Sequence, residues 1–542
     1  MQRVNRIMQR CLFAISIISM VEVLPAKNYY VSPVDGNDRN EGTSVEMPFK
    51  TLKRLSEVVF MPGDSVLLHT QGIHEGGLKL EGVCGAEAHP IVVSAYDTEV
   101  GRRRLARIDA SCAVAGVYMN NCRYVEVSRL HITADGGTPD ELSVQEKMRC
   151  GVLVKVSKKG DFGNIRLWQM KVEDIFYLSK GSARGKKEVR TANGTQPYGW
   201  GIRFINSVQD AMLHHIDVDH CEIENVSHTG IKITGKKHNI KNFTLACNSV
   251  SRTGGPGIQI SGGEDGSVHH NSVTYSGSED DSRKWGRGSG LWTWSSANVV
   301  IEKNQFMYAN GPGDSAGAHI DFNCSDIVMQ YNLSAYNAGG FCEILGNNYR
   351  CMYRYNISVN DGFRRKGKGG AFQEGKTLWT SGYIGKTKPK GPFDSYIYNN
   401  TIYAASDILS QMAIGNTTEG LVVANNIIYV KGDMRSVLGD QYRSEKKGES
   451  KAKDIMVSNN LFRKIDDWNQ AVGFESVKSV EGNPGFVKEG GLCLADYVPT
   501  NVRMVKNRGM KIKLPKGVIK ADTDILGRKI TGKPDLGAIE CE

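Results

Sequence analysis

The chain has 542 residues, of which 40% are hydrophobic and 61 are glycine, a composition that excludes an intrinsically disordered protein. Its formal net charge is +10, but no nucleic-acid-binding motif accompanies this charge, so we expect no nucleic-acid partner. After residue 26, no apolar run approaches the roughly 18 residues of a membrane-spanning helix, so we also expect no membrane span.

Residues 1–26 have the composition of a secretory signal peptide. Arg3, Arg6 and Arg10 precede an apolar run at Cys11–Val21, and the small residue Ala26 ends the segment. The run is too short to cross a bilayer, and its cysteine precedes the apolar residues, which argues against a lipoprotein. We therefore expect cleavage of this segment and a secreted or periplasmic location. We also expect the mature protein to be a monomer.

Residues 27–62 are predicted to form an N-terminal strand and a capping helix. Tyr29–Val31 has strand character, and Pro48–Leu52 begins a short amphipathic helix that would cover the open end of a stack of β-coils. Residues 63–482 then alternate short apolar strands with glycine-rich turns, starting with Gly63–Leu68 and His89–Val93. Residues 483–542 are expected to form a C-terminal extension that caps the other end.

Three N-terminal motifs and the chain ending carry a family resemblance. The opening YYVSPVDGND, followed by GT and PFKTL, the step GDSVLL and the strand HPIVVSAYD are similar to secreted right-handed parallel β-helix proteins of the pectate-lyase-like superfamily. The ending at Asp524–Arg528 and Asp535–Glu540 resembles the usual close of the same proteins. The resemblance implies an all-β fold, a right-handed parallel β-helix with an N-terminal cap. It leaves the reaction open, because this scaffold carries lyases, hydrolases, esterases and non-catalytic tailspikes.

Two neighbouring segments support this fold independently, because both repeat one pattern of a glycine, an alternating strand and a second strand that ends in asparagine. Gly290 and Gly317 begin the two copies, 27 positions apart, and Asn304 and Asn332 end their second strands, 28 positions apart. Such a period without helical spacing is typical of a β-solenoid, here of roughly ten coils. We expect the residues at this position to mark a coil corner, where asparagine adopts the left-handed backbone conformation and stacks its amide. The series is Cys221, Asn248, Asn271, Asn304, Asn332, Asn356, Asn400, Asn426 and Asn460.

One strand of each coil is predicted to present polar and aromatic side chains to solvent. The copies are Gly230–Thr234, Gly257–Ser261, Gly290–Trp294 and Gly317–Asp321, and alternation places their isoleucines inside. The outward set is then Lys232, Thr234, Gln259, Ser261, Trp292, Trp294, His319 and Asp321. Exposed tryptophan faces are suited to stacking on sugar rings, which predicts a polysaccharide or oligosaccharide ligand. The alternative is that the two tryptophans pack under the insertion at Glu279–Arg287.

The same strip contains the candidate catalytic residues Asp321, Glu343, His319 and Asp314. Counting back from the corner asparagine places Glu343 beside His319 on the outside, whereas counting forward from Gly340 places it inside. We favour the outward register, because a buried unpaired carboxylate is costly. Two carboxyl groups about 6.5–9.5 Å apart fit an inverting glycoside hydrolase, in which one acid protonates the leaving oxygen and the other activates water. The candidate substrate-binding residues are Trp292, Trp294, Lys232, Gln259, Arg364 and Arg365.

The spaced motif DSAGAHIDFN, QYNLS and YRYNIS resembles β-helix proteins grouped with glycoside hydrolases, which implies the location of the site. The alternative enzyme is a polysaccharide lyase that cleaves a uronate glycan by β-elimination, with Lys232, Arg364 or Arg365 as base or clamp and Ca²⁺ as a possible cofactor. A third possibility is a non-catalytic glycan-binding solenoid.

We expect no cofactor or metal in the hydrolase. Asp217–His220 is interpreted as a solvated strand face rather than a metal site. Eleven cysteines follow Cys11 without a CxxC motif, and we expect those at repeat positions to be small buried side chains that stack between coils. These repeat-position cysteines are Cys221, Cys247, Cys324, Cys342 and Cys351.

Overall fold

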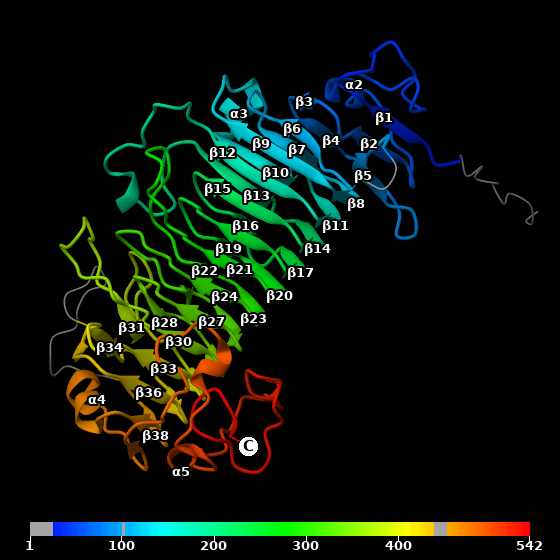
Figure 1. Cartoon of the computed structure of the whole chain (residues 1–542). Coiled ribbons are helices and arrows are strands. Elements are labelled where there is room, and N and C mark those ends of the chain that lie inside the picture. The colour runs from blue at the N-terminus through cyan, green and yellow to red at the C-terminus, as the bar shows by residue number, and fades with distance from the viewer. Residues whose placement is uncertain (1–24, 100–102, 438–451, 542) are drawn as a thin grey trace, which may run out of the picture.

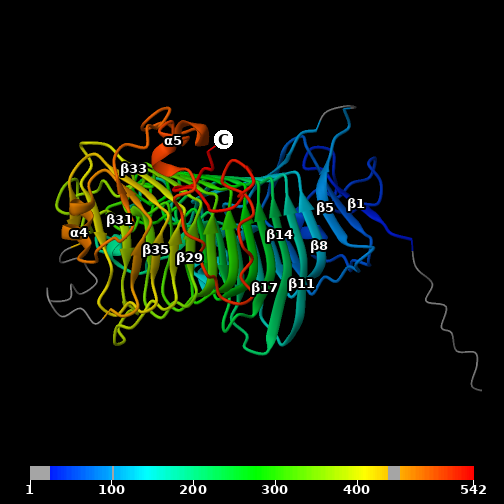
Figure 2. The same ribbon diagram turned by 90° about the horizontal axis from the view of Figure 1, so that it is seen from below.

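The computed structural model describes residues 25–99, 103–437 and 452–541. Its strands stack into one elongated solenoid with three parallel sheets along its length (Figures 1 and 2). The predicted signal peptide lies almost wholly outside the described residues. Within those residues, no helix has the length and apolar character that crossing a membrane requires.

Over the described residues, two sheets have 14 strands and one has 12, and adjacent strands within each sheet run parallel. Sheet A consists of β1 (Asn28–Val31), β2 (Ser65–His69), β5 (Ile91–Tyr96), β8 (Arg123–Ser128), β11 (Gly160–Trp168), β14 (Ala211–Asp219), β17 (Ile240–Ala246), β20 (Gly263–His269), β23 (Ala297–Glu302), β26 (Ser325–Gln330), β29 (Met352–Arg354), β32 (Tyr396–Tyr398), β35 (Val422–Ala424) and β38 (Met456–Ser458). Sheet B consists of β3 (Ile73–Glu75), β6 (Ala106–Asp109), β9 (Leu130–Asp135), β12 (Lys171–Phe176), β15 (Glu222–Val226), β18 (Ser249–Ser251), β21 (Ser272–Thr274), β24 (Gln305–Met307), β27 (Leu333–Ala335), β30 (Ile357–Val359), β33 (Thr401–Ala404), β36 (Ile427–Val430), β39 (Leu461–Phe462) and β40 (Val480–Glu481). Sheet C consists of β4 (Leu78–Glu81), β7 (Ala115–Asn120), β10 (Met148–Val156), β13 (Tyr198–Asn206), β16 (Ile231–Thr234), β19 (Ile258–Ser261), β22 (Leu291–Trp294), β25 (Ala318–Ile320), β28 (Gly340–Ile344), β31 (Lys376–Thr380), β34 (Ser410–Ala413) and β37 (Met434–Ser436).

The helices are short and lie at the ends of the solenoid or in the connections between strands. They are α2 (Leu52–Leu55), α3 (Glu141–Glu146), α4 (Ile465–Val472) and α5 (Val502–Val505), with 3-10 turns η1 (Glu188–Arg190) and η2 (Leu494–Tyr497). The prediction of an all-β parallel solenoid is therefore confirmed.

The solenoid has more coils than the roughly ten predicted, since the described part of sheet A alone has 14 strands. The extra coils lie mainly at the N-terminal end, where the corner position carries other side chains. Leu130 and Met170 occupy the place, at the start of sheet B, that asparagine occupies later in the chain. A count of corner asparagines in the sequence therefore includes only the later coils.

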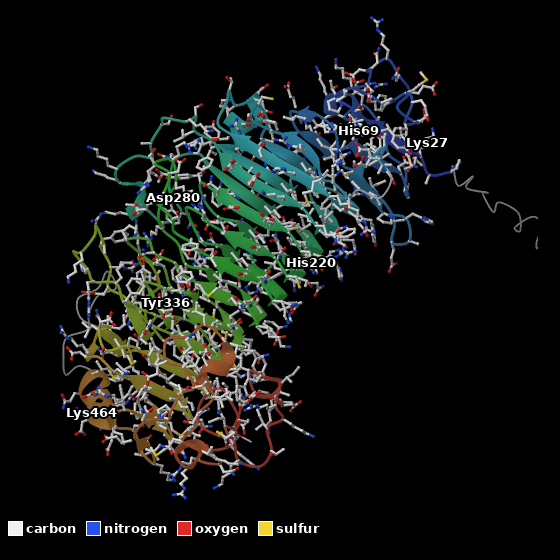
Figure 3. All side chains as sticks on the ribbon, in the orientation of Figure 1. Lys27, His69, His220, Asp280, Tyr336 and Lys464 are labelled. Carbon is white, nitrogen blue, oxygen red and sulfur yellow. The ribbon has the colours of Figure 1, made fainter. Side chains whose placement is uncertain are left out.

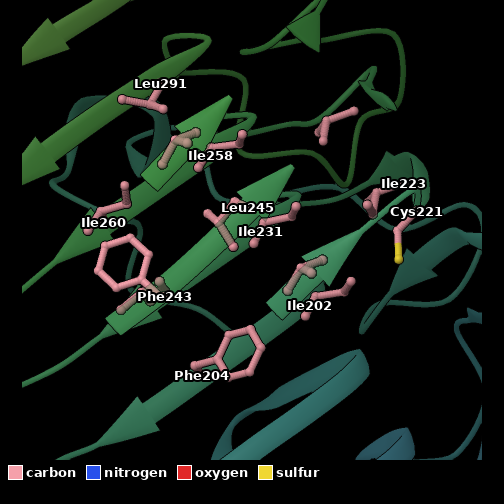
Figure 4. Close-up of a cluster of buried hydrophobic side chains, with 14 of the residues drawn as sticks. Ile202, Phe204, Cys221, Ile223, Ile231, Phe243, Leu245, Ile258, Ile260 and Leu291 are labelled. Atoms are coloured by element: carbon pink, nitrogen blue, oxygen red, sulfur yellow. The ribbon is translucent and has the colours of Figure 1, made fainter. Parts of the chain in front are cut away.

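The core consists of aliphatic side chains that stack from coil to coil. Ile202, Ile231, Ile258 and Leu291 are register partners on successive strands of sheet C, and all are fully buried (Figure 4). Burial of each such side chain contributes about 1.5–3 kcal/mol, and the stack repeats along the solenoid. The predicted inward orientation of the isoleucines is confirmed, and it requires alternate residues of these strands to point outward.

The corner between sheets A and B is held by a ladder of buried asparagines. The side-chain Oδ1 of Asn332 accepts the backbone N–H of Asn304 at 3.0 Å, and its Nδ2 donates to the Oδ1 of Asn356 at 2.9 Å. The prediction of a left-handed asparagine was wrong by one residue. The residue before each ladder asparagine is left-handed, for example Tyr331 with φ 56° and His270 with φ 56°. That preceding residue makes the turn, which directs the asparagine side chain inward.

Both ends of the chain pack against the coils. At the N-terminus, β1 pairs with β2 as the first strand of sheet A, and Leu52 and Leu55 of α2 are buried. At the C-terminus, the segment after α5 runs back along the outside of the solenoid instead of only covering its end (Figure 2). There Asn399 donates to the carbonyl of Asp535 at 2.8 Å, and the N–H of Gly537 donates to the carbonyl of Asn425 at 2.7 Å.

Two loops are tied together over the outer face of sheet C. One connects β12 to β13 and the other connects β21 to β22. The Arg184 N–H donates to the carbonyl of Ser282 at 2.9 Å, and the Trp285 Nε1 donates to the carbonyl of Glu188 at 2.8 Å. Trp285 packs in one apolar cluster with outward side chains of sheet C, so these loops cover the N-terminal part of that face.

Candidate active site

The candidate catalytic residues lie on the outer face of sheet C, at β25 and β28. His319 is the register partner of Trp292 on the preceding strand. Ile320 pairs with Ile344, so Glu343 lies beside His319 on the next strand, at the spacing of about 4.8 Å between neighbouring strands. The structure thus has the outward register for Glu343. Gly340 pairs with Ala316 and not with Gly317, which is why counting forward from Gly340 gave the opposite parity.

Asp321 follows β25 directly and is partly buried beside an aromatic wall. The Phe322 ring lies 6.0 Å from the Trp294 ring and 5.8 Å from the Tyr383 ring, and the Phe322 N–H donates to the Asp321 Oδ1 at 2.8 Å. Burial raises the pKa of Asp321 to about 8; the Phe322 N–H opposes this rise, and the negative charge of Glu343 adds to it. Asp321 is therefore mostly a neutral, protonated acid at neutral pH.

Asp314 lies in the turn before β25 and is held as a carboxylate. Arg287 Nε and Nη2 donate to its two oxygens at 2.7 and 3.1 Å. Burial raises the pKa of Asp314, but the charge and hydrogen bonds of Arg287 outweigh it, assisted by His319 and Arg364, and the pKa is lowered to about 2. The same segment thus carries an ionised and a protonated carboxyl group.

His319 lies on β25 between Asp314 and Asp321 in the sequence and is buried, with 5% of its surface exposed. Its Nδ1 is 3.1 Å from the Ser289 Oγ, and that oxygen accepts the Ala316 N–H at 3.0 Å. Burial lowers the pKa of His319, although Glu343 and Asp314 oppose this shift. The imidazole is therefore neutral at pH 7, and Ser289 fixes its orientation.

The two predicted stacking tryptophans differ in exposure. Trp294 is 37% exposed, whereas Trp292 is 6% exposed and packs in the cluster that contains Trp285. The insertion therefore covers Trp292, as in the alternative interpretation of the sequence, and leaves Trp294 accessible beside Asp321. Trp292 contacts the site through the His319 ring, whose centroid lies 5.5 Å away.

Lys232 and Gln259 are brought together, but away from the carboxyl groups. Both donate to the Asn193 Oδ1, at 3.3 and 3.2 Å, and both are buried beneath the loop before β13. Lys232 Nζ also lies 4.8 Å from the Trp200 ring centroid. Because β16 is three strands from β25, Lys232 is roughly 14 Å along the sheet from the row of His319.

The two arginines that were predicted to bind substrate, Arg364 and Arg365, have different surroundings. Arg364 is buried, and its Nη1 donates to the carbonyls of Gly311 and Asp314, each at 2.9 Å. It therefore holds the turn that positions Asp314. Arg365 is partly exposed on the following loop.

Sequence reasoning missed several residues that shape the site. Arg287 and Ser289 stand in the turn before β22, and Tyr383 stands in the loop after β31. No periodic signal marks them, because they lie in turns and insertions outside the strand alternation. A buried His228 stacked between Trp200 and Trp285, with ring centroids 3.9 and 4.6 Å away, was also missed, because it lies in the short turn between β15 and β16.

Comparison with known proteins identifies the architecture. Residues 200–381 match the family model described as the right-handed β-helix region. The protein is a right-handed parallel β-helix. The predicted handedness and the resemblance in fold are thereby confirmed.

This β-helix is 23% identical, over 95% of its length, to a lacto-N-biosidase of Bifidobacterium longum, and it spans 36% of the length of that relative. Among solved structures, it is similar to a GH136 lacto-N-biosidase from Eubacterium ramulus, with a TM-score of 0.53 and 19% identity over 79% of this chain and 67% of the other. A rhamnogalacturonan lyase matches with a TM-score of 0.42 and 14% identity over 80% of this chain and 87% of the other.

Proposed function

We propose that this protein is an exported glycoside hydrolase that cleaves a glycan at the outer face of β25. The observation that supports this proposal most directly is the opposite displacement of two carboxyl pKa values within one short segment, to about 8 for Asp321 and about 2 for Asp314. Hydrolysis of a glycosidic bond needs one protonated and one ionised carboxyl group at the same pH.

In the proposed reaction, Asp321 donates its proton to the glycosidic oxygen as the bond to the sugar carbon breaks. The leaving group departs as a neutral alcohol with the bonding electron pair. Asp314 then either removes a proton from the attacking water or attacks the sugar carbon itself, and the anomeric configuration of the product distinguishes these routes. Neutral His319, on β25, would donate a hydrogen bond to a sugar hydroxyl or accept one from it.

Glu343 is the alternative partner for Asp321. It lies one strand and two residues from Asp321, which corresponds to roughly 8 Å between their Cα atoms. We assign it instead the role of keeping Asp321 protonated, because its negative charge raises the pKa of that acid. In this role Glu343 is a positioning residue.

The similarity to lacto-N-biosidases supports a hydrolase and makes a lacto-N-bioside the first candidate substrate. The lyase alternative has weaker support from the site. Its proposed base Lys232 is three strands away from the carboxyl pair, and Arg364 is engaged by backbone carbonyls.

The test is a digest of a chromogenic lacto-N-bioside and of a panel of neutral and uronate-containing glycans, read by new reducing ends and by ultraviolet absorbance. Reducing ends without absorbance are expected. Absorbance from a new carbon–carbon double bond would instead establish a lyase, and neither signal on the whole panel would favour the binding solenoid.

The catalytic assignment is tested with Asp321→Asn, Asp314→Asn and Glu343→Gln. We expect the two aspartate variants to lose activity by at least about 10³-fold, since each removes an obligatory proton donor or carboxylate, and Glu343→Gln by about 10–100-fold. Full activity in either aspartate variant would contradict the assignment. If Glu343→Gln were as inactive as Asp321→Asn while Asp314→Asn were active, Glu343 would replace Asp314 as the partner carboxylate.

A further inference from the structure

A cluster of three different metal-ligand types lies at the corner between sheets A and B. A carboxylate oxygen of Asp219, a ring nitrogen of His220 and the sulfur of Cys247 all lie within 4.8 Å of one another. Figure 3 shows His220 at the edge of the solenoid opposite the loops that carry Asp280. The cluster is therefore separate from the candidate active site on sheet C.

The coil repeat brings these residues together although 27 positions separate His220 from Cys247. Both occupy the left-handed corner position of successive coils, with φ 50° and 55°, immediately before the ladder position. Asp219 ends β14 and is the register partner of Ala246, so Cys247 follows one strand spacing from His220. Residues at equal corner positions stack at about 4.8 Å.

The side chains are reachable from solvent, in contrast to the buried role predicted for the cysteine. The His220 and Asp219 side chains are 62% and 29% exposed, and Cys247 is partly exposed with a free thiol. The other four repeat-position cysteines are buried, as predicted. Cys247 differs because it occupies the turning residue of the corner, whose side chain points outward, and not the ladder position.

A hydrogen-bond contact already holds two of the three side chains together. The Nδ1 of His220 lies 2.8 Å from the Oδ1 of Asp219, so the imidazole is held directly beside the carboxylate. His270 occupies the same corner position one coil beyond Cys247, with φ 56°. His269, whose Nδ1 is 3.0 Å from that of His270, and the acidic Glu302 lie on the adjoining strand ends.

We propose that Asp219, His220 and Cys247 bind one divalent transition-metal ion of the Zn²⁺ type, with His270 placed to complete the ligand set. A mixture of nitrogen, sulfur and oxygen ligands selects borderline ions such as Zn²⁺ and Co²⁺, and disfavours Ca²⁺ and Mg²⁺, which take oxygen ligands. Bound there, the ion links successive coils from outside. The proposal is independent of the catalytic assignment.

The test uses Co²⁺ as a spectroscopic substitute, added to the reduced, full-length protein without a histidine tag. The expected result is a near-ultraviolet thiolate-to-cobalt charge-transfer band that one equivalent of Zn²⁺ removes. Cys247→Asn should abolish the band, and His220→Asn should lower the Zn²⁺ affinity in calorimetry by about 10–100-fold. Asparagine is chosen because it tolerates the left-handed conformation at both positions.

The matched control is Cys84→Ala, which removes another exposed thiol and should leave the band and the Zn²⁺ affinity unchanged. Circular dichroism confirms that each variant is folded. The proposal is overturned if the band is absent from the parent protein, if it persists in Cys247→Asn, or if Co²⁺ binds only without a charge-transfer band, as it would at the exposed pair His214–His215.

Discussion

At the scale of single residues, the candidate site depends on unlike surroundings for two like side chains. Asp321 stands beside Phe322 and its aromatic neighbours, where a charge is poorly solvated, and Asp314 faces the guanidinium of Arg287. Both are aspartates seven positions apart in the sequence. Only their surroundings give them complementary protonation states, which is the requirement for acid–base work at one pH.

This difference predicts the pH dependence of activity. The kcat/KM for glycan hydrolysis should fall as pH rises through about 8, because Asp321 then loses the proton that it must donate. On the acid side, the pKa of Asp314, lowered to about 2, predicts no loss in the weakly acidic range. Steady-state rates measured from mildly acidic to alkaline pH check this, and a basic limb centred near pH 4–5 would contradict the role of Asp321 as the acid.

A second prediction at this scale concerns Trp294, the exposed aromatic beside Asp321. Trp294→Ala should raise the KM about tenfold and change kcat by less than about threefold, since a stacking contact is made equally in the ground state and the transition state. Trp168→Ala is the control, because Trp168 is a partly exposed tryptophan on sheet A. A fall in kcat with an unchanged KM would show that Trp294 does not act as a sugar platform.

At the scale of elements, the asparagine ladder joins sheets A and B in each coil that carries it. Asn332→Ala should lower the free energy of unfolding by about 2–4 kcal/mol, because it leaves the Asn304 N–H and the Ile301 carbonyl without their buried partner. Denaturant unfolding followed by circular dichroism measures the change.

The control for the ladder is Asn310→Ala, at an exposed position outside the ladder. Its effect should lie within about 0.5 kcal/mol of the parent protein. Equal effects of the two substitutions would mean that the ladder amides contribute no more than surface asparagines do.

The elements also show where sequence reasoning succeeded. The alternation in Ile231–Thr234 and Ile258–Ser261 predicts both the strands and their inward faces, because a period of two has only one buried side. The register of Glu343 needed a second reference point, since Gly340 aligns with Ala316 and not with the glycine it resembles. Local pattern identifies the strand, but the neighbouring coil fixes which of its faces is outside.

At the scale of the whole molecule, the C-terminal segment holds the later coils from outside. Tyr331, Tyr355 and Tyr398 pack against side chains from Ile512 to Ile530, and Arg354 donates to the carbonyl of Ile519 at 2.8 Å. This segment therefore covers apolar surface at the corner of sheets A and B.

Removal of residues 506–542 should lower the thermal midpoint by several degrees, because this apolar surface becomes exposed. The coils should keep their β-sheet circular dichroism, and light scattering should report association through the uncovered tyrosines. Ile519→Ser, at a side chain that is 81% exposed, is the control and should shift the midpoint by less than about 1 °C. An unchanged midpoint after the deletion would show that the segment does not stabilise the solenoid.

The sequence by itself determined the solenoid, its inward aliphatic faces, the asparagine corner and the segment that carries Asp314, His319 and Asp321. These features are periodic or local. Because each coil stacks on the one before it, the same pattern recurs along the amino-acid sequence and can be recognised there. The tertiary structure alone decided that Trp292 is covered while Trp294 is exposed, and that Arg287 holds Asp314 in its ionised form. Residues of an insertion make these contacts. Because the side chains of an insertion pack across several coils, their positions do not follow the repeat of the sequence.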